Sequence, residues 1–333
     1  MFNKNFRDNP YIIAEIGANH NGNFSKACFL IKSAKKAGCD AVKFQSWDEN
    51  LNCSSYYKKN KAELANYLKY KLDYKKLKKL RKLAKKIQID FGITPFTIKQ
   101  LKEAIKLKCN FIKIASMDLN NYPFIEEVSK IKTDLIVSTG FSTKEEIKYA
   151  SNIIKKRNKK NVIFLHCVSL YPPKNEKLIN LNNMQTIKKI TGFEVGFSDH
   201  TKWIETPITA AALGAKVIEK HFTFNKNAKG WDHSVSADFE EMKNLVSATK
   251  KANKLRGQFE RKLSKDEIRK SKIMRRSIVV KNDVKKNQII KITDLDLQRP
   301  GTGIPPLYLK KVLNRRVNKK ITKGEILKFS HLN

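Results

Sequence analysis

Hydrophobic residues gather in eight short runs over the first two thirds of the chain. The runs are nearly continuous and rich in β-branched residues, which is typical of strands buried on both faces. They are residues 11–17, 41–45, 90–96, 110–116, 134–140, 161–167, 194–200 and 216–222. The segments between them carry the spacing of amphipathic helices. The pattern predicts a (β/α)8 barrel, the TIM-barrel arrangement of the α/β class.

A doubly wound sheet is the competing α/β architecture. Such sheets usually have fewer strands, and the first run here is not followed by the Gly-x-Gly-x-x-Gly loop of a dinucleotide site. Helices are expected at 25–37, with Ser25 as N-cap, and at 143–156, where TKEE forms a capping box. The number of strands and the missing glycine-rich loop favour the barrel over the doubly wound sheet.

The chain divides into three parts by its pattern. The barrel is predicted over residues 1–257, a charged linker over 258–274, and a small β-rich domain over 275–333, where short β-type runs alternate with turn residues. Within the barrel, the connection over residues 47–72 is longer than usual βα loops. Long loops at this end of a barrel are often functional, so we expect a lid there.

Composition sets broad limits on location and class. The 333 residues are 41% hydrophobic, but no run of about 18 apolar residues is present that would span a bilayer. The N-terminus lacks the apolar core of a signal peptide, so we expect a cytoplasmic protein without membrane insertion. The five cysteines form no CxxC pair, which argues against disulfides and thiolate zinc. They are Cys28, Cys39, Cys53, Cys109 and Cys167.

The net charge of +38 is high enough to suggest a polyanionic partner. Its placement favours another interpretation. In residues 72–88, leucine, alanine and isoleucine occupy one helical face while lysines fill the rest, as on an ordinary solvated helix. We therefore expect no specific nucleic-acid partner. A basic nucleic-acid-binding protein on a degenerate barrel remains the alternative from another functional class.

Lysines interrupt two of the apolar runs, Lys43 in AVKFQ and Lys113 in FIKIAS. A lysine in a barrel interior needs an anion beside it. An internal pair with Glu15 or Glu219 would serve, and so would a bound phosphate or carboxylate. Serines at the ends of neighbouring strands favour the phosphate, because hydroxyl and ammonium donors around one point form an anion site. These are Ser116, Ser138 and Ser198.

Two histidines, His200 and His221, end the seventh and eighth runs. Strands seven and eight are neighbours in a barrel, so the two imidazoles would meet at its mouth and share a metal. Imidazole ligands without cysteine suit an open octahedral Mn²⁺, Mg²⁺ or Fe²⁺ site better than closed structural zinc. An open coordination position is what polarisation of a carbonyl requires.

Taken together, the motifs EIGANHNG, VKFQ, ITPF, KIASMDLNNYP, VSTG, LHCVSLYP, GFSDHT, EKHFT, GWDHSVS and RPGTGI resemble the sialic acid synthase family. The resemblance runs from about residue 10 to the end. It implies a barrel followed by an antifreeze-like SAF domain, usually in a domain-swapped homodimer. It also implies a transferase that condenses phosphoenolpyruvate with an N-acetylated amino sugar, releases phosphate, uses a divalent cation and serves surface-polysaccharide synthesis.

The resemblance also implies roles for individual residues. His200 and His221 would hold Mn²⁺, or Mg²⁺, and Glu15 would handle a proton. Phosphoenolpyruvate would be held by Lys43, Thr94, Lys113, Ser116, Ser138 and Ser198. The sugar would be contacted by Gln45, Asp118, Tyr171 and Asp232, and by Arg299 of the partner subunit.

Several positions depart from familiar members of the family. Asp118 stands where many have Glu, Ser169 where Asn is frequent, and GWDHSVS replaces GPD forms. The acceptor is therefore open between N-acetylmannosamine and the 2,4-diacetamido-trideoxyhexoses that lead to legionaminic or pseudaminic acid. A synthase that makes a three-deoxy sugar acid from a sugar phosphate is the alternative within enzymes, although such enzymes generally lack the SAF domain.

Overall fold

The computed structural model describes residues 9–47, 49, 51–157 and 159–333. The expectation that the N-terminus carries no signal peptide rests on residues 1–8, which lie outside the described residues, as do residues 48 and 50 of the long connection. The chain forms two compact units, Met1–Gly257 and Gln258–Asn333.

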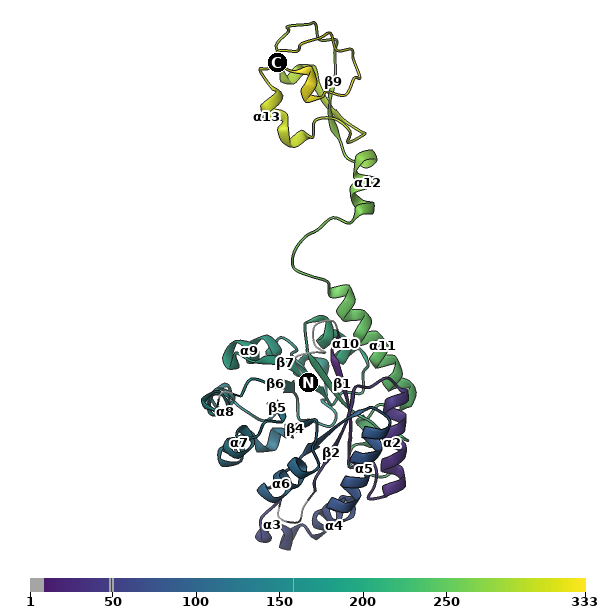
Figure 1. The fold of residues 1–333 in the computed structure, drawn as a ribbon, viewed down its shortest axis with the longest axis vertical. Helices are drawn as coiled ribbons and strands as arrows, with labels where there is room; N and C mark the ends of the chain where they lie inside the picture. The colour runs from purple at the N-terminus through teal and green to yellow at the C-terminus, as the bar shows by residue number, and fades with distance from the viewer. Residues whose placement is uncertain (1–8, 48, 50, 158) are drawn as a thin grey trace. The chain divides into compact units, whose positions relative to one another are not determined.

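Eight parallel strands close into a barrel in sequence order, with helices around them (Figure 1). The predicted (β/α)8 fold is confirmed. The strands are β1 (Tyr11–Gly17), β2 (Ala41–Gln45), β3 (Asp90–Thr94), β4 (Phe111–Ile114), β5 (Asp134–Ser138), β6 (Val162–Cys167), β7 (Glu194–Asp199) and β8 (Val217–His221).

The helices of this unit follow their strands along the chain. They are α2 (Phe24–Lys36), α3 (Ser54–Lys59), α4 (Lys61–Tyr70), α5 (Tyr74–Lys86), α6 (Ile98–Lys106), α7 (Tyr122–Ser129), α8 (Lys144–Lys156), α9 (Asn183–Thr191), α10 (Glu205–Ala212) and α11 (Phe239–Arg256). The capping box of α8 is confirmed, with Thr143 and Glu146 bonded reciprocally. The choice of Ser25 as N-cap of α2 is wrong, because the side chain of Asn23 accepts from the backbone N–H of Lys26.

Side chains alternate between the inside and the outside of the barrel along each strand. On the inside, the layer nearest the amino-terminal ends of the strands, called the lower layer here, is apolar and fully buried. It includes Tyr11, Ile13, Phe111 and Val217. Because the side-chain period of a strand is two, the next inward position of β1 after Ile13 is Glu15. This alternation therefore places the predicted polar residues, such as Glu15, inside the barrel near the carboxyl ends of its strands.

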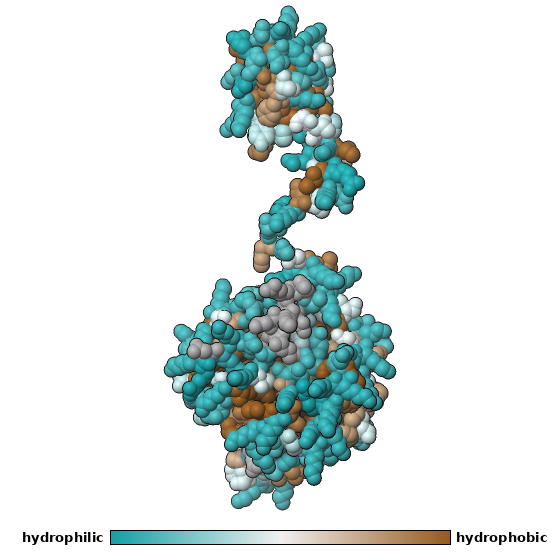
Figure 2. Space-filling model, viewed as in Figure 1, coloured by the Kyte–Doolittle hydropathy of each residue, from teal (hydrophilic) through white to brown (hydrophobic). Residues whose placement is uncertain are grey.

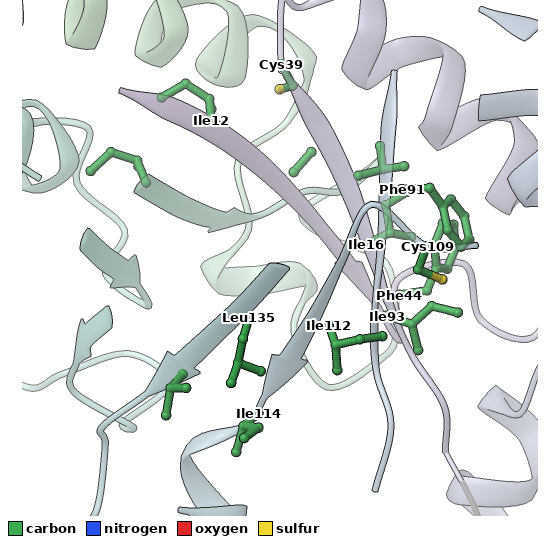
Figure 3. Close-up of a cluster of buried hydrophobic side chains, with 14 of the residues drawn as sticks. Ile12, Ile16, Cys39, Phe44, Phe91, Ile93, Cys109, Ile112, Ile114 and Leu135 are labelled. Atoms are coloured by element: carbon green, nitrogen blue, oxygen red, sulfur yellow. The ribbon is translucent and has the colours of Figure 1, made fainter. Parts of the chain in front are cut away.

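The outward positions of the strands pack against the helices and form the main core. Figure 3 shows part of this layer, in which Phe44 and Phe91 from neighbouring strands stack with ring centroids 5.3 Å apart. Helix α5 buries Leu77, Leu80 and Ala84 against the barrel, as the spacing predicts. Burying one such side chain contributes about 1.5 to 3 kcal/mol.

Hydrophilic side chains cover most of the visible face of the barrel unit (Figure 2). The lysines of α5 agree with this, since Lys75, Lys78, Lys79 and Lys82 are all exposed or half-buried. Across the described residues, no helix combines the length and the apolar character needed to cross a bilayer.

The second unit has its own small core around Ile278, Val280, Ile321 and Leu327. Strands β9 (Ser277–Val280) and β10 (Leu295–Gln298) pair antiparallel, and a short helix α13 (Leu309–Val312) follows. The stretch predicted as a linker contains helix α12 (Lys265–Met274), which begins with a capping box between Ser264 and Glu267. The sequence pattern did not predict this helix.

Gly92 of β3 lies directly beside Phe111 of β4 in the lower layer. A Cβ atom at position 92 would stand 2.2 Å from the ring of Phe111. We expect Gly92→Ala to lower the free energy of unfolding of the barrel by about 1 to 3 kcal/mol through overpacking. Urea unfolding followed by tryptophan fluorescence measures this, since the three tryptophans (Trp47, Trp203 and Trp231) all belong to the barrel unit.

Phe111→Leu provides the control, because it makes room for the added methyl group. In the double variant Gly92→Ala/Phe111→Leu, we expect a loss clearly smaller than the sum of the two single losses. Strictly additive losses would contradict the packing explanation.

Candidate active site at the mouth of the barrel

Two buried lysines and two buried glutamates form one charged cluster inside the barrel. The Nζ of Lys43 lies 2.5 Å from Oε2 of Glu15 and 3.9 Å from Oε2 of Glu219. The Nζ of Lys113 donates to Oε1 of Glu219 at 3.1 Å. All four residues are at most 5% exposed. The internal Lys–Glu pairing weighed in the sequence analysis is therefore present for both lysines.

The two glutamates titrate in opposite directions. Burial raises the pKa of Glu15 above its usual range, against the opposing charge of Lys43. Burial also disfavours the charge of Glu219, but Lys113 and Lys43 outweigh it and hold the pKa of that carboxyl below its usual range. Glu219 is thus the fixed negative charge of the cluster, while Glu15 is the carboxyl suited to exchange a proton near neutral pH.

Hydroxyl groups surround the lysines. Lys43 donates to Oγ1 of Thr94 at 2.9 Å, and Ser198 donates to Oε1 of Glu219 at 2.8 Å. Ser138 lies in the same cavity, and its buried Oγ has no hydrogen-bond partner among the described residues. A buried polar group without a partner costs about 1 to 3 kcal/mol, so this hydroxyl is placed to meet a ligand.

His200 and His221 lie side by side at the ends of β7 and β8, with ring centroids 5.6 Å apart. Burial lowers the pKa of His200 to about 4 and lowers that of His221 well below its usual value, so both rings are neutral. Nδ1 of His200 donates to the carbonyl oxygen of Val168 at 2.8 Å, which leaves Nε2 with its lone pair. Nδ1 of His221 lies 3.6 Å from Oδ2 of Asp232.

These two imidazoles fit an open metal centre. A neutral ring whose other nitrogen is held by a carbonyl is the form in which histidine binds a metal. Among the described residues no group of three or more His, Cys, Asp or Glu side chains gathers to hold an ion. A two-histidine set suits an ion that keeps several water ligands, and it does not suit a closed structural zinc site.

A cavity of about 580 Å³ joins the charged cluster to the histidines. The ring of Tyr171 lies over His200, with centroids 4.1 Å apart, and the buried Oε1 of Gln45 has no partner among the described residues. Burial raises the pKa of Asp232 to about 6. Twelve predicted site residues line this cavity: Glu15, Lys43, Gln45, Thr94, Lys113, Ser116, Ser138, Tyr171, Ser198, His200, His221 and Asp232.

Two predicted residues are not among the cavity lining. Asp118 follows Ser116 in a short 3₁₀ helix, and its Oδ2 is buried without a hydrogen-bond partner among the described residues. Burial raises its pKa to about 6. Arg299 belongs to the second unit, so its reach into a barrel stays a prediction.

The site also contains an aromatic wall that the sequence analysis missed. Trp47 stacks between Tyr67 of α4 and Phe96, with ring centroids 5.3 and 5.4 Å away, and Trp231 meets Trp47 edge to face at 5.2 Å. All four line the cavity. Tyr67 comes from the long connection expected to be a lid, where the density of aromatic residues was the available signal.

The model of the NeuB family matches residues 30–261 of this chain, and that of the SAF domain matches residues 275–333. An N,N'-diacetyllegionaminic acid synthase of Campylobacter jejuni is 36% identical over 95% of this chain and 98% of its own length. A pseudaminic acid synthase of the same species is 34% identical over 96% of both chains.

A solved structure supports the same assignment. The N-acetylneuraminic acid synthetase of Leptospira borgpetersenii, crystallised with citrate, superposes with a TM-score of 0.74 and 34% identity, over 79% of this chain and 90% of that one. This similarity agrees with the resemblance drawn from the sequence motifs. The chain therefore belongs to the NeuB family, and it is a nonulosonic acid synthase, a transferase that joins phosphoenolpyruvate to an amino sugar.

Proposed function

We propose that the acceptor of this enzyme is a 2,4-diacetamido-trideoxyhexose, which would give a nonulosonic acid of the legionaminic or pseudaminic type and inorganic phosphate. The aromatic wall of Trp47, Tyr67, Phe96 and Trp231 supports this choice. Such a sugar carries a methyl group and two acetamido groups in place of hydroxyls, and apolar groups gain free energy against aromatic rings. N-acetylmannosamine, which is more polar, is the second candidate.

The observation that carries the proposal is the pair of buried lysines beside the two histidines. Burial disfavours the charge of Lys43, but Glu15 and Glu219 outweigh it and raise the pKa of that lysine. Glu219 is the one cluster carboxylate whose ionisation the surroundings favour. With the pKa of Glu15 raised, the cluster has surplus positive charge that an anionic substrate would balance. The phosphate and carboxylate of phosphoenolpyruvate would be held there, with Thr94, Ser116, Ser138 and Ser198 as hydroxyl donors.

The reaction forms a bond between C3 of phosphoenolpyruvate and the aldehyde carbon, adds a proton to the aldehyde oxygen, and replaces the phosphate with water. Glu15 is the carboxyl proposed to move a proton at this centre, because its buried side chain lies next to the phosphate-binding lysine. Gln45, Asp118, Tyr171 and Asp232 would position the sugar.

The proposal includes a divalent cation at His200 and His221, Mn²⁺ in the first place and Mg²⁺ as the alternative. When bound, such an ion acts as a Lewis acid toward a carbonyl oxygen. The protein contributes the two neutral imidazoles, the carbonyl of Val168 that fixes the ring of His200, and Asp232 beside His221. The hydrogen bond to Val168 orients the ring of His200, and Asp232 lies 3.6 Å from Nδ1 of His221.

A cytoplasmic location and a domain-swapped homodimer also belong to the proposal. In that dimer, Arg299 would reach the sugar in the barrel of the partner subunit. Both rest on the family resemblance. The alternative of a three-deoxy sugar acid synthase is disfavoured by the SAF domain over residues 275–333.

Phosphate release tests the acceptor directly. With phosphoenolpyruvate and Mn²⁺, we expect release with a 2,4-diacetamido-trideoxyhexose at a kcat/KM at least about tenfold above that with N-acetylmannosamine, because the wall favours the less polar sugar. A colorimetric phosphate assay with mass analysis of the product measures this. Faster turnover of N-acetylmannosamine would overturn the proposed acceptor.

Loss of either histidine should remove the metal. We expect His200→Ala and His221→Ala each to lower kcat/KM at least about 100-fold and to weaken Mn²⁺ binding at least about tenfold, because each variant deletes one of two imidazoles. Titration of Mn²⁺ by electron paramagnetic resonance gives a readout independent of activity.

His331→Gln is the matched control, since His331 is a similarly buried histidine in the second unit. It should leave Mn²⁺ affinity unchanged. Full Mn²⁺ affinity in both His200→Ala and His221→Ala would contradict the proposed metal centre.

A further inference from the structure

A second cavity of about 510 Å³ lies beside the catalytic one. Its lining comes from the end of β6, from the segments that follow β5 and β6, from the start of α8 and from α9. Two residues, Phe141 and Ser169, line both cavities. The two spaces are therefore adjacent, and Phe141 stands at the boundary between them.

The backbone at Phe141 is held in an unusual conformation. Its φ is +63°, in the left-handed region that bulky residues rarely adopt, and its side chain is 75% exposed. An exposed aromatic ring in a strained conformation buries little apolar surface, so packing does not explain why it is there. Strain of this kind concentrates at functional sites.

The preceding residue explains how the turn is fixed. The backbone N–H of Gly140 donates to Oγ of Ser116 at 3.1 Å. A Cβ atom at position 140 would stand 2.1 Å from Oγ of Ser169 and 2.8 Å from Sγ of Cys167. The chain therefore passes tightly over these side chains immediately after Ser138, and this close approach sets the position from which the ring of Phe141 projects.

The second cavity has the chemistry of a pocket for a short acyl group. Aliphatic walls come from Ile147, Ile187 and Ile190, while polar groups come from Ser169, from Asn183, from several threonines and from Lys144. A pocket that combines aliphatic walls with hydrogen-bonding side chains suits an amide-linked hydrocarbon chain. In the proposed function the acceptor aldehyde lies at His200 and His221, and we take the acyl substituent at C4 to be the part of the sugar that meets this boundary.

We infer that Phe141 is a specificity-determining residue that limits the size of the N-acyl substituent at C4 of the acceptor, by separating the catalytic cavity from the second cavity. This inference rests on the proposed function. Removal of the ring would join the two cavities, and a longer acyl chain would then enter the second one.

The test compares the 2,4-diacetamido-trideoxyhexose with its 4-butanamido analogue. In Phe141→Gly, the ratio of kcat/KM for the butanoyl to the acetyl sugar should rise at least about tenfold over wild type, mainly through KM. The KM for phosphoenolpyruvate should stay within about threefold, because the lysines that hold it are untouched. Glycine also relieves the positive φ, so the unfolding midpoint should not fall.

Phe141→Tyr is the matched control, since it keeps the ring and should leave the ratio within about threefold of wild type. An unchanged ratio in a folded Phe141→Gly variant would overturn the inference. So would a rise in KM for phosphoenolpyruvate without a change in the ratio. Absence of phosphate release with the acetylated sugar in the wild type would instead overturn the proposed acceptor.

Discussion

The charged cluster of Glu15, Lys43, Lys113 and Glu219 is the constraint on which the site depends. Four ionisable side chains lie inside a barrel, where each isolated charge would cost several kcal/mol of desolvation. They are tolerated because β1, β2, β4 and β8 bring opposite charges within contact distance. The barrel must be closed to achieve this, since β1 pairs with both β2 and β8.

The alternation of side chains along the strands explains how the barrel can be stably packed and still contain a reactive centre. Apolar layers below the cluster supply packing, and the outward residues of each strand supply the main core. Because the core is built elsewhere, the inward positions near the carboxyl ends can hold buried polar groups without a hydrogen-bond partner among the described residues, such as those of Ser138 and Gln45. Such groups destabilise a protein until a ligand binds them. Phe141, which has a strained backbone three residues after Ser138, belongs to this group of features.

The sequence predicts much of this arrangement because strand periodicity is a local signal. Eight apolar runs give the barrel, and Lys43, Lys113, His200 and His221 are conspicuous because they interrupt such runs or end them. The sequence does not show which buried charged residues pair with each other across the barrel. Glu219 was one of two possible partners for the lysines, and its contact with Lys113 spans 106 residues.

The remaining differences also have physical reasons. The aromatic wall depends on where the long connection folds back, which no short-range pattern encodes, and Tyr67 and Trp231 meet across 164 positions of the chain. Asn23 caps α2, although the sequence analysis chose Ser25. Asparagine and serine are both good N-cap residues, and these two lie only two positions apart, so the sequence pattern does not distinguish them. Arg299 lies in the second unit, so the fold of the barrel unit alone does not place it at the site.

The most direct test of the central claim is the binding of phosphoenolpyruvate in the absence of an acceptor, measured by isothermal titration calorimetry. Lys113→Met should weaken binding about 10- to 100-fold, because one charge-assisted contact is worth about 1.5 to 3 kcal/mol. The double variant Lys113→Met/Glu219→Gln, which leaves no unpaired charge at that contact, should bind equally weakly. Lys159→Met removes a lysine that contacts backbone carbonyls ahead of β5, and it should bind normally. Full affinity in both Lys113 variants would contradict the account.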